Sequence, residues 1–261
     1  MGKITDALKK AADQRMEHIE KVNRIKKHDA FVVQKMQDSR VDPRIIVYFD
    51  PKAAVSEQYK ILRTNILSLD KKAPPKVVMV TSSTHSEGKT ITSLNLAMAM
   101  VQSKSSHKVL VIDADLRRGR IAKYLGVEQE QGLSELLSGE AELKDVIFNI
   151  DVPNISFISA GRVPPHPVEL LESRSMTDLI ATARKMFDMV IIDTPPVISV
   201  TDAGIVGPMT DGVLMVVQAG RVQRGIVRHA EELLYQSHTR MLGHVLTNIE
   251  YHLPEYVYRY L

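Results

Sequence analysis

The sequence predicts an α/β protein with a mainly parallel sheet and helices on both of its faces. After Pro75, short apolar runs of strand length alternate with longer stretches of helical character, which is typical of sheets built from strand–helix–strand units. The runs are apolar throughout, as expected for strands that are buried on both faces. The chain has 261 residues, of which 44% are hydrophobic and 25% charged. It is therefore long enough to bury such a core and too apolar to be largely disordered.

Residues 1–50 are predicted to form a helical arm and a linker. Residues 5–37 contain neither Gly nor Pro, and their apolar side chains recur at a loosely helical spacing. The Asp-Pro pairs at 42–43 and 50–51 break this pattern and indicate the linker. Residues 1–40 hold ten basic and six acidic side chains, so the net charge of +3 is concentrated there. Because acids are mixed among the bases, a solvated helix is favoured over the alternative, a surface for nucleic acid or anionic lipid.

The rest of the chain is predicted to divide into a domain, residues 51–250, and a tail, residues 251–261. The domain begins with a helix over Val55–Leu69, for which Ser56 is the candidate N-cap, and two prolines separate this helix from the sheet. The predicted strands are Val77–Thr81, Val109–Asp113, Ile155–Ile158, Val190–Asp193, Val213–Val217 and His244–Leu246. Ligands of such sheets bind beyond the carboxyl ends of the strands, so the residues there are the candidates for a site.

Composition excludes several classes of protein. Cysteine is absent, which excludes disulfide scaffolds, thiolate metal sites, iron–sulfur clusters and cysteine nucleophiles. No apolar run approaches the roughly 18 residues that cross a bilayer, and the first residues lack the apolar core of a signal peptide. We therefore expect a cytoplasmic protein.

A phosphate-binding loop is predicted after the first strand. Residues 82–90 read Ser-Ser-Thr-His-Ser-Glu-Gly-Lys-Thr, and a helical stretch follows. Backbone N–H groups at such a helix start face an anion. Gly88 permits close approach, Lys89 supplies charge to the β- and γ-phosphates, and Thr90 offers a hydroxyl to Mg²⁺. Ser83 replaces the first glycine of the general motif and Gly-Lys-Thr alone is common, so an ordinary strand–turn–helix connection is the alternative.

Two further strands are predicted to end in aspartates on the same edge of the sheet. Asp113 ends the second strand, and Asp115 and Arg117 follow it at intervals of two residues. Asp193 ends the fourth strand before Thr-Pro-Pro. Carboxylates in this position hold Mg²⁺ or accept a proton. An aspartate at a strand end often only caps the next helix, but two such runs beside a phosphate loop favour a functional site.

The end of the chain is rich in tyrosine. Four of the eight tyrosines lie in the last eleven residues, at Tyr251, Tyr256, Tyr258 and Tyr260. Short polar spacers and one proline predict a mobile tail. The alternative is an edge strand packed on the domain, because the last three tyrosines recur at a period of two.

The phosphate loop, the Asp-x-Asp-x-Arg run and the Asp-Thr-Pro-Pro run together resemble the bacterial tyrosine kinases (BY-kinases), the autokinases of capsular and exopolysaccharide assembly systems. The resemblance covers roughly residues 50–261 and includes Gly132–Gly139 and Gly161–Leu171. In the loop, His85-Ser86 replaces the Pro-Gly of the family, so Ser86 is expected to adopt the backbone angle of a glycine.

The resemblance also implies an oligomerisation helix, which carries Glu57, Lys60 and Arg63. Lys60 stands where the family has an arginine. The resemblance further implies a homo-oligomer and protein tyrosines as substrates. It implies an activator that is the cytoplasmic segment of a membrane polysaccharide co-polymerase, and this partner is expected to recruit the kinase to the inner face of the membrane. No nucleic acid is implied.

For the site, the resemblance implies a P-loop protein that uses ATP and Mg²⁺ to phosphorylate tyrosines of its own tail or of a neighbour's. Asp113 is the implied acceptor of the tyrosine proton, and Asp115 joins it and Lys89 as a catalytic residue. Thr90, Asp115 and Asp193 are the implied ligands of Mg²⁺ or of its waters. The implied nucleotide-binding residues are His85, Ser86, Glu87, Gly88, Lys89, Thr90, Ile91 and Asn248.

Two alternatives remain open. A partitioning or division-site ATPase shares the expected fold and acts by nucleotide-driven dimerisation. That group carries a lysine early in the phosphate loop, where this chain has Thr84, and it commonly ends in a basic membrane helix, which the sequence does not predict here. The second alternative is a regulatory partner that binds nucleotide without catalysis.

Overall fold

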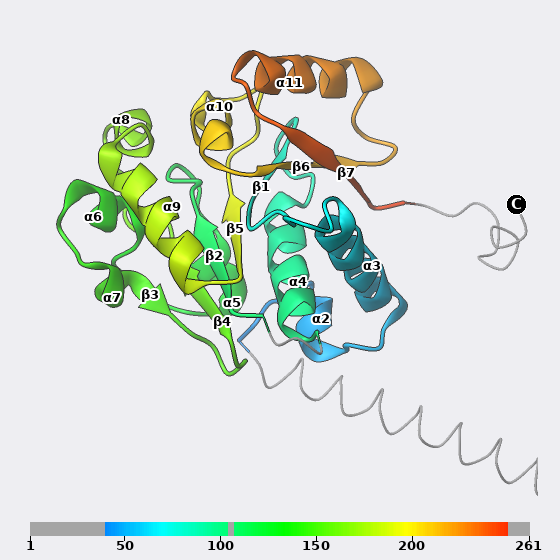
Figure 1. The fold of residues 1–261 in the computed structure, drawn as a ribbon, viewed down its shortest axis with the longest axis horizontal. Helices are drawn as coiled ribbons and strands as arrows, with labels where there is room; N and C mark the ends of the chain where they lie inside the picture. The colour runs from blue at the N-terminus through cyan, green and yellow to red at the C-terminus, as the bar shows by residue number, and fades with distance from the viewer. Residues whose placement is uncertain (1–39, 104–106, 250–261) are drawn as a thin grey trace, which may run out of the picture.

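The computed structural model describes residues 40–103 and 107–249 (Figure 1). The predicted arm up to residue 39 and the predicted tyrosine tail lie outside the described residues. Among the described helices none is long and apolar enough to cross a membrane.

The core of the fold is a seven-stranded sheet with the order β3-β4-β2-β5-β1-β6-β7. All neighbouring strands run parallel except β3, which is antiparallel to β4. The strands are β1 (Val77–Ser82), β2 (Val109–Asp113), β3 (Ile147–Phe148), β4 (Ile155–Ile158), β5 (Met189–Asp193), β6 (Gly212–Gln218) and β7 (Met241–Thr247). The predicted class and all six predicted strands are confirmed. Strand β3 was not predicted, because two residues carry no readable pattern.

Helices cover both faces of the sheet (Figure 1). One face packs against α2 (Ile46–Phe49), α3 (Ala54–Ser68), α4 (Lys89–Val101) and α5 (Ile121–Leu125). The other face packs against α6 (Leu133–Ser138), α7 (Leu143–Val146), α8 (Pro167–Leu171), α9 (Arg174–Met186), α10 (Asp202–Val206) with the short η1 (Gly207–Met209), and α11 (Arg224–Gln236). In Figure 1, α3 lies beside α4, and α11 lies over the β6–β7 end of the sheet.

Strand β1 explains why the strands are apolar throughout. Successive side chains of a strand point to opposite faces, so Val77 and Met79 enter one hydrophobic core and Val78 and Val80 enter the other. All four side chains are fully buried. Burying an aliphatic side chain stabilises the fold by roughly 1.5–3 kcal/mol.

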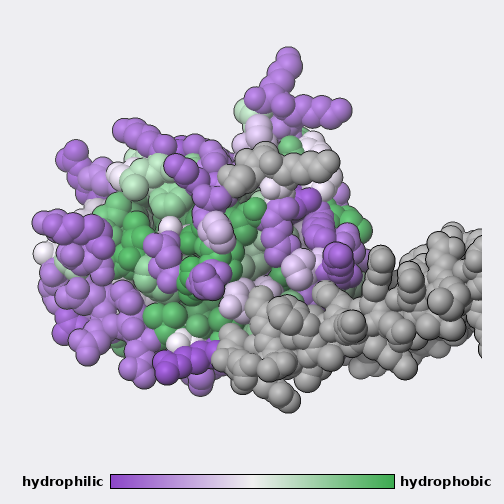
Figure 2. Space-filling model, turned by 90° about the horizontal axis from the view of Figure 1, so that it is seen from below, coloured by the Kyte–Doolittle hydropathy of each residue, from purple (hydrophilic) through white to green (hydrophobic). Residues whose placement is uncertain are grey.

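The edge strand β7 is only partly covered. Between the hydrophilic groups of the surface, Figure 2 shows hydrophobic residues on the face seen from below.

The stretch predicted as a linker is packed on the domain. It contains α2, and Ile45 and Val47 are fully buried. The side chain of Asn95, on α4, accepts a hydrogen bond from Val47 N at 3.0 Å and donates one to Arg44 O at 2.9 Å. These contacts satisfy the buried amide and fix the stretch against the helix that follows the phosphate loop.

The prediction that Ser56 caps the first helix of the domain is wrong. Helix α3 begins at Ala54, and Ala53 is its N-cap residue. The hydroxyl of Ser56 instead donates a hydrogen bond to Asp50 O at 2.6 Å, which ties the first turn of the helix to the preceding loop.

Candidate active site

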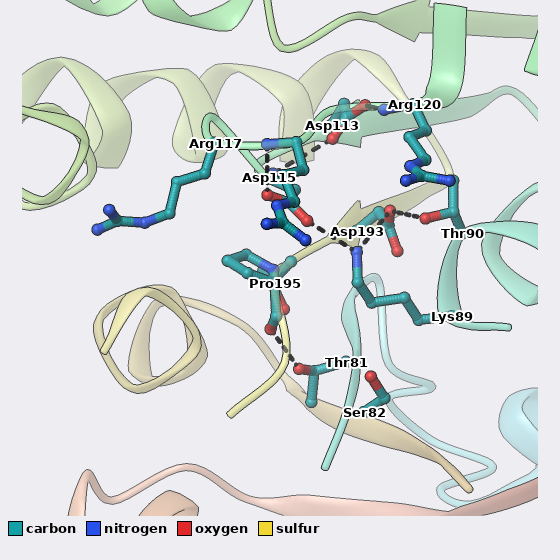
Figure 3. Close-up of polar contacts among 12 residues, drawn as sticks. Thr81, Ser82, Lys89, Thr90, Asp113, Asp115, Arg117, Arg120, Asp193 and Pro195 are labelled. Carbon is teal, nitrogen blue, oxygen red and sulfur yellow. Dashed lines mark hydrogen bonds and ion pairs between the residues drawn. The ribbon is translucent and has the colours of Figure 1, made fainter. Parts of the chain in front are cut away.

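The sheet order brings the predicted site residues together. Strand β5 lies between β1 and β2, and in the register Asp193 is paired with Val80 on one side and with Asp113 on the other. The carboxyl ends of these parallel strands therefore meet beside the phosphate loop. Figure 3 shows the Lys89 side chain pointing into the group formed by Asp115, Asp193 and Thr90.

The phosphate loop adopts two left-handed backbone positions. Gly88 has φ 93° and Ser86 has φ 64°, so the serine takes the angle expected of the glycine it replaces. This conformation is unfavourable for a residue with a Cβ atom. Arg221, from the loop after β6, donates a hydrogen bond to Ser86 O at 3.1 Å. That contact helps to hold the serine in place.

Glu87 braces the loop from inside the protein. Its side chain is 1% exposed. One carboxylate oxygen accepts hydrogen bonds from the backbone N–H and hydroxyl of Thr84, and the other accepts one from Gln218 N at 3.1 Å. Thr247 donates a hydrogen bond to Glu87 O at 2.8 Å. The carboxylate is thus bonded within the protein, and the nucleotide-binding role of Glu87 stays a prediction.

Lys89 lies between two carboxylates. Its Nζ atom is 3.1 Å from Asp115 Oδ2 and 3.5 Å from Asp193 Oδ2. Burial alone would lower the pKa of Lys89, but the charges of Asp193, Asp115 and Asp113 outweigh it and hold the pKa above its usual value. The ammonium group is therefore charged at neutral pH and available to an anion at this edge of the sheet.

Asp193 is bound from α4 as well as from Lys89. Thr90 donates a hydrogen bond to its Oδ2 at 2.6 Å, and Ser93 donates one to its Oδ1 at 3.2 Å. Burial raises the pKa of Asp193, and the Lys89 charge and the Thr90 hydrogen bond oppose that rise without cancelling it. The Thr90 hydroxyl and the Asp193 carboxylate are hard oxygen donors, as Mg²⁺ prefers.

Asp113 is an acid with a strongly raised pKa. Burial, and next the charge of Asp193, raise its pKa to about 7. Its Oδ2 accepts hydrogen bonds from Arg120 N at 2.8 Å and Ile121 N at 2.9 Å, and its Oδ1 accepts one from Asp115 N at 3.2 Å. The side chain thus caps the start of α5, as a strand-end aspartate often does, and also has a pKa suited to proton transfer near neutral pH.

A cavity of about 210 Å³ opens beside these groups. Asp115 lines this cavity, and so do six of the eight residues that were predicted to bind the nucleotide: His85, Ser86, Gly88, Lys89, Thr90 and Ile91. Of the other two, Glu87 is turned inward. Asn248 follows Thr247, whose side chain lies against Gly88, and does not line this cavity.

Four lining residues were not predicted from the sequence, namely Arg44, Arg118, Arg120 and Tyr124. Arg118 and Arg120 follow the Asp-x-Asp-x-Arg run directly, so their closeness in sequence to Asp115 was a usable signal. Arg44 comes from the stretch predicted as a linker and lies over the Tyr124 ring, 5.0 Å from its centre; no pattern in the sequence joins these two. A second cavity, of about 440 Å³, is lined from α6 to α8 and includes none of the phosphate-loop residues.

The predicted oligomerisation residues lie on α3. Lys60 contacts Glu57 at 2.7 Å and donates a hydrogen bond to Pro51 O at 2.6 Å. Arg63 donates a hydrogen bond to Ala99 O, in α4, at 2.7 Å. Within one subunit, these side chains therefore fasten α3 to its neighbours.

Comparison with known proteins identifies the family. Residues 76–232 match the family described as an AAA domain. The tyrosine-protein kinase YwqD of Bacillus subtilis is 34% identical over 214 residues, which cover 82% of this chain and 90% of that protein. The chain belongs to the bacterial protein-tyrosine kinases. The predicted family and the predicted enzyme class are thereby confirmed.

Comparison with solved structures agrees with this family assignment. The kinase domain of the Escherichia coli tyrosine kinase ETK has a TM-score of 0.72 at 33% identity, covering 80% of this chain and 83% of that one. The Pyrococcus furiosus cell division ATPase MinD has a TM-score of only 0.56 at 25% identity, covering 66% and 71%. The P-loop fold is thus shared with the division ATPases, whereas the closer likeness is to tyrosine kinases. Thr84, which replaces the signature lysine of the division ATPases, is bound to Glu87 within the loop.

Proposed function

We propose that the kinase transfers the γ-phosphoryl group of ATP to tyrosines of its own tail in a neighbouring subunit, and that this phosphorylation regulates the synthesis and export of a polysaccharide. The observation that carries the proposal is the position of Lys89, between Asp115 and Asp193 and next to Thr90 at the start of α4. A phosphate loop alone supports nucleotide binding, and the carboxylates beside it add the groups that a phosphoryl transfer to a hydroxyl requires.

Lys89 and the loop amides are proposed to hold the β- and γ-phosphates. Thr90 and Asp193, with Asp115, are proposed to hold Mg²⁺ or its waters, and their oxygen atoms fit the preference of that ion. When bound, Mg²⁺ would neutralise charge that develops on the phosphates during transfer. In this proposal the chain would supply two carboxylates to Mg²⁺, those of Asp115 and Asp193, and phosphate and water oxygens would supply its remaining ligands.

Asp113 is proposed to accept the tyrosine proton. In the transfer, the tyrosine oxygen forms a bond to the γ-phosphorus, the bond from that phosphorus to the ADP oxygen breaks, and the phenolic proton passes to the carboxylate. A free tyrosine ionises near pH 10, so an acceptor with a pKa of about 7 suits the reaction at neutral pH. Asp115 lines the cavity and Asp113 lies behind it. Asp115 is therefore proposed to orient the incoming hydroxyl group toward Asp113, which accepts its proton.

Transfer between subunits is favoured by the short connection to the tail. Thr247 lies against Gly88, and four extended residues reach only about 13–14 Å beyond it. Tyr251 therefore has little chain with which to turn back into its own site. We propose a homo-oligomer that uses α3 with Glu57, Lys60 and Arg63, and tail tyrosines Tyr251, Tyr256, Tyr258 and Tyr260 as acceptors.

The resemblance supports a cytoplasmic kinase that a membrane partner recruits. We propose that this partner is the cytoplasmic segment of a polysaccharide co-polymerase and that it activates the kinase. A purified segment of this kind would be expected to raise the rate of autophosphorylation.

The proposal is tested with Lys89→Met, and Lys185→Met is the control because Lys185 is an exposed lysine near the end of α9. Each purified chain is treated with a phosphatase, incubated with ATP and Mg²⁺, and analysed for phosphotyrosine. We expect strong labelling of wild type and of Lys185→Met and none of Lys89→Met. When wild type is added, the tail of Lys89→Met should become labelled by transfer from it. Equal labelling of Lys89→Met and wild type in separate reactions would refute the proposed site.

A further inference from the structure

Two arginines at the mouth of the 210 Å³ cavity have no acidic partner among the residues that the structure describes. Arg118 and Arg120 are exposed and line the cavity together with Lys89 and Thr90. Within residues 40–103 and 107–249 neither side chain forms an ion pair. The neighbouring arginines differ: Arg117 pairs with Asp202 at 3.1 Å, and Arg44 pairs with Asp42 at 2.8 Å.

The backbone fixes both arginines directly to the carboxylates of the site. Arg118 N donates a hydrogen bond to Asp115 Oδ1 at 3.0 Å, and Arg120 N donates one to Asp113 Oδ2 at 2.8 Å. Gly119 between them is packed so closely that a Cβ atom there would collide with Ala160 and lie 3.0 Å from Asp113 Oδ2. The loop cannot easily shift. The backbone from which the two side chains extend is thus held beside the reacting centre.

In Figure 3, the Arg120 side chain extends on the side of Thr90, whereas Arg117 points away from the carboxylates. The phosphates of a nucleotide already have Lys89 and the loop amides as partners. An arginine presents a planar fork of donors that fits a carboxylate with two hydrogen bonds. The free pair is therefore suited to a carboxylate that arrives with the second substrate.

The tail contains such carboxylates directly before two of its tyrosines. Glu250 precedes Tyr251 and Glu255 precedes Tyr256, whereas Val257 precedes Tyr258 and Arg259 precedes Tyr260. Neighbouring Cα atoms are 3.8 Å apart. A glutamate before the acceptor therefore arrives within the reach of an arginine at the rim, while an arginine in that position would be repelled.

We propose that Arg118 and Arg120 select acceptor tyrosines that follow an acidic residue, so that Tyr251 and Tyr256 are phosphorylated before Tyr258 and Tyr260. This inference rests on the proposed function and adds to it the class of acceptor. The two arginines act on specificity and not on the chemical step.

The test is a double-mutant cycle on the full chain. Each protein is first treated with a phosphatase, and mass spectrometry then measures the initial rate of phosphorylation at each tyrosine. The chains are wild type, Glu255→Gln, the double variant Arg118→Gln with Arg120→Gln, and the combination of all three changes. Lys123→Gln, which removes one exposed charge from α5 without lining the cavity, is the control. The apparent KM for ATP is measured for every chain.

In wild type, Glu255→Gln should lower the rate at Tyr256 by about fivefold to tenfold, as expected for the loss of a charge-assisted contact, and leave the rate at Tyr251 unchanged. In the arginine double variant, Glu255→Gln should have no further effect, and the KM for ATP should stay within about twofold. Lys123→Gln should behave as wild type.

The inference is overturned if Glu255→Gln has no effect in wild type, or the same effect in both backgrounds. It is also overturned if the arginine double variant mainly raises the KM for ATP, because the arginines would then bind nucleotide. These outcomes leave the proposed function intact. If wild type labels no tail tyrosine while it labels other proteins, the tail as substrate fails and this inference fails with it.

Discussion

Replacing Asp113 with asparagine is expected to abolish phosphorylation and, in the absence of ligand, to stabilise the protein at neutral and alkaline pH. The two effects have one cause. The carboxylate is buried beside Asp193, where its ionised form is unfavourable, and the same burial gives it a pKa fit to accept a proton. Asparagine keeps the shape of the side chain but neither ionises nor accepts the proton.

The size of the stability change follows from the pKa. In the unfolded chain the pKa is near the ordinary value of 3.8, and in the folded protein it is about 7. Because the folded state binds the proton more tightly, the free energy of unfolding falls as the pH rises through this window. The shift corresponds to about 4 kcal/mol at pH 8, and about 2 kcal/mol of it is already present at pH 5.5.

The Asp113→Asn side chain also has one hydrogen-bond acceptor oxygen fewer than the carboxylate that it replaces. It has one carbonyl oxygen, which can serve Arg120 N and Ile121 N, so Asp115 N is left without its partner at a cost of about 1 kcal/mol. The variant should therefore be more stable than wild type by about 3 kcal/mol at pH 8 and by about 1 kcal/mol at pH 5.5.

The assay is urea denaturation of nucleotide-free protein with a chelator present, at both pH values, for wild type, Asp113→Asn and Asp178→Asn. Asp178 is an exposed residue of α9 and serves as the control. A stability difference between Asp113→Asn and wild type that does not change with pH would refute the reasoning about the buried charge. Full phosphorylation by the variant would refute Asp113 as the proton acceptor.

Three further outcomes are expected. Asp193→Asn should weaken Mg²⁺-dependent ATP binding at least about tenfold in titration calorimetry, since Thr90, Ser93 and Lys89 all contact that carboxylate; equal affinities for variant and wild type would exclude Asp193 from the metal site. Glu87→Gln should destabilise the fold by about 1–3 kcal/mol, because an amide cannot accept hydrogen bonds from every donor that the buried carboxylate serves. A change below about 0.5 kcal/mol in denaturant titrations would argue against a stabilising role for this carboxylate. Each tail phosphate adds about −1.5 to −2 charges, so phosphorylated wild type should be monomeric, whereas Lys89→Met with nucleotide should be oligomeric. Size-exclusion chromatography with light scattering measures the two masses, and equal masses would exclude a coupling between tail phosphorylation and assembly.

Much of the site could be predicted because parallel strands place their carboxyl ends on one edge. A run of apolar residues that ends in Asp113, and another that ends in Asp193, put both carboxylates near any loop that follows a third strand. That argument needs the sheet class but not the strand order. The order itself, with β5 between β1 and β2, depends on crossovers that local sequence does not encode.

The sequence could not reveal which polar side chains turn inward. Glu87 lies in the loop motif like its neighbours, yet its carboxylate bonds Thr84 and Gln218, because the fold brings the end of β6 against the loop. In the same way, two Asp-Pro pairs indicated a linker around α2. Buried residues such as Ile45, and the amide of Asn95, pack that stretch onto α4 through contacts about 50 residues apart in sequence.

The fate of the γ-phosphoryl group distinguishes a tyrosine kinase from an ATPase switch. Phosphatase-treated full-length protein is incubated with γ-labelled ATP and Mg²⁺, and the label is followed at once in tyrosine phosphate, in inorganic phosphate and in ATP. In wild type the label should appear first on tail tyrosines, in step with ADP formation, and Lys89→Met should leave the label in ATP. Label released as inorganic phosphate, with no tyrosine phosphate at any time, would contradict kinase activity and would identify an ATPase switch instead.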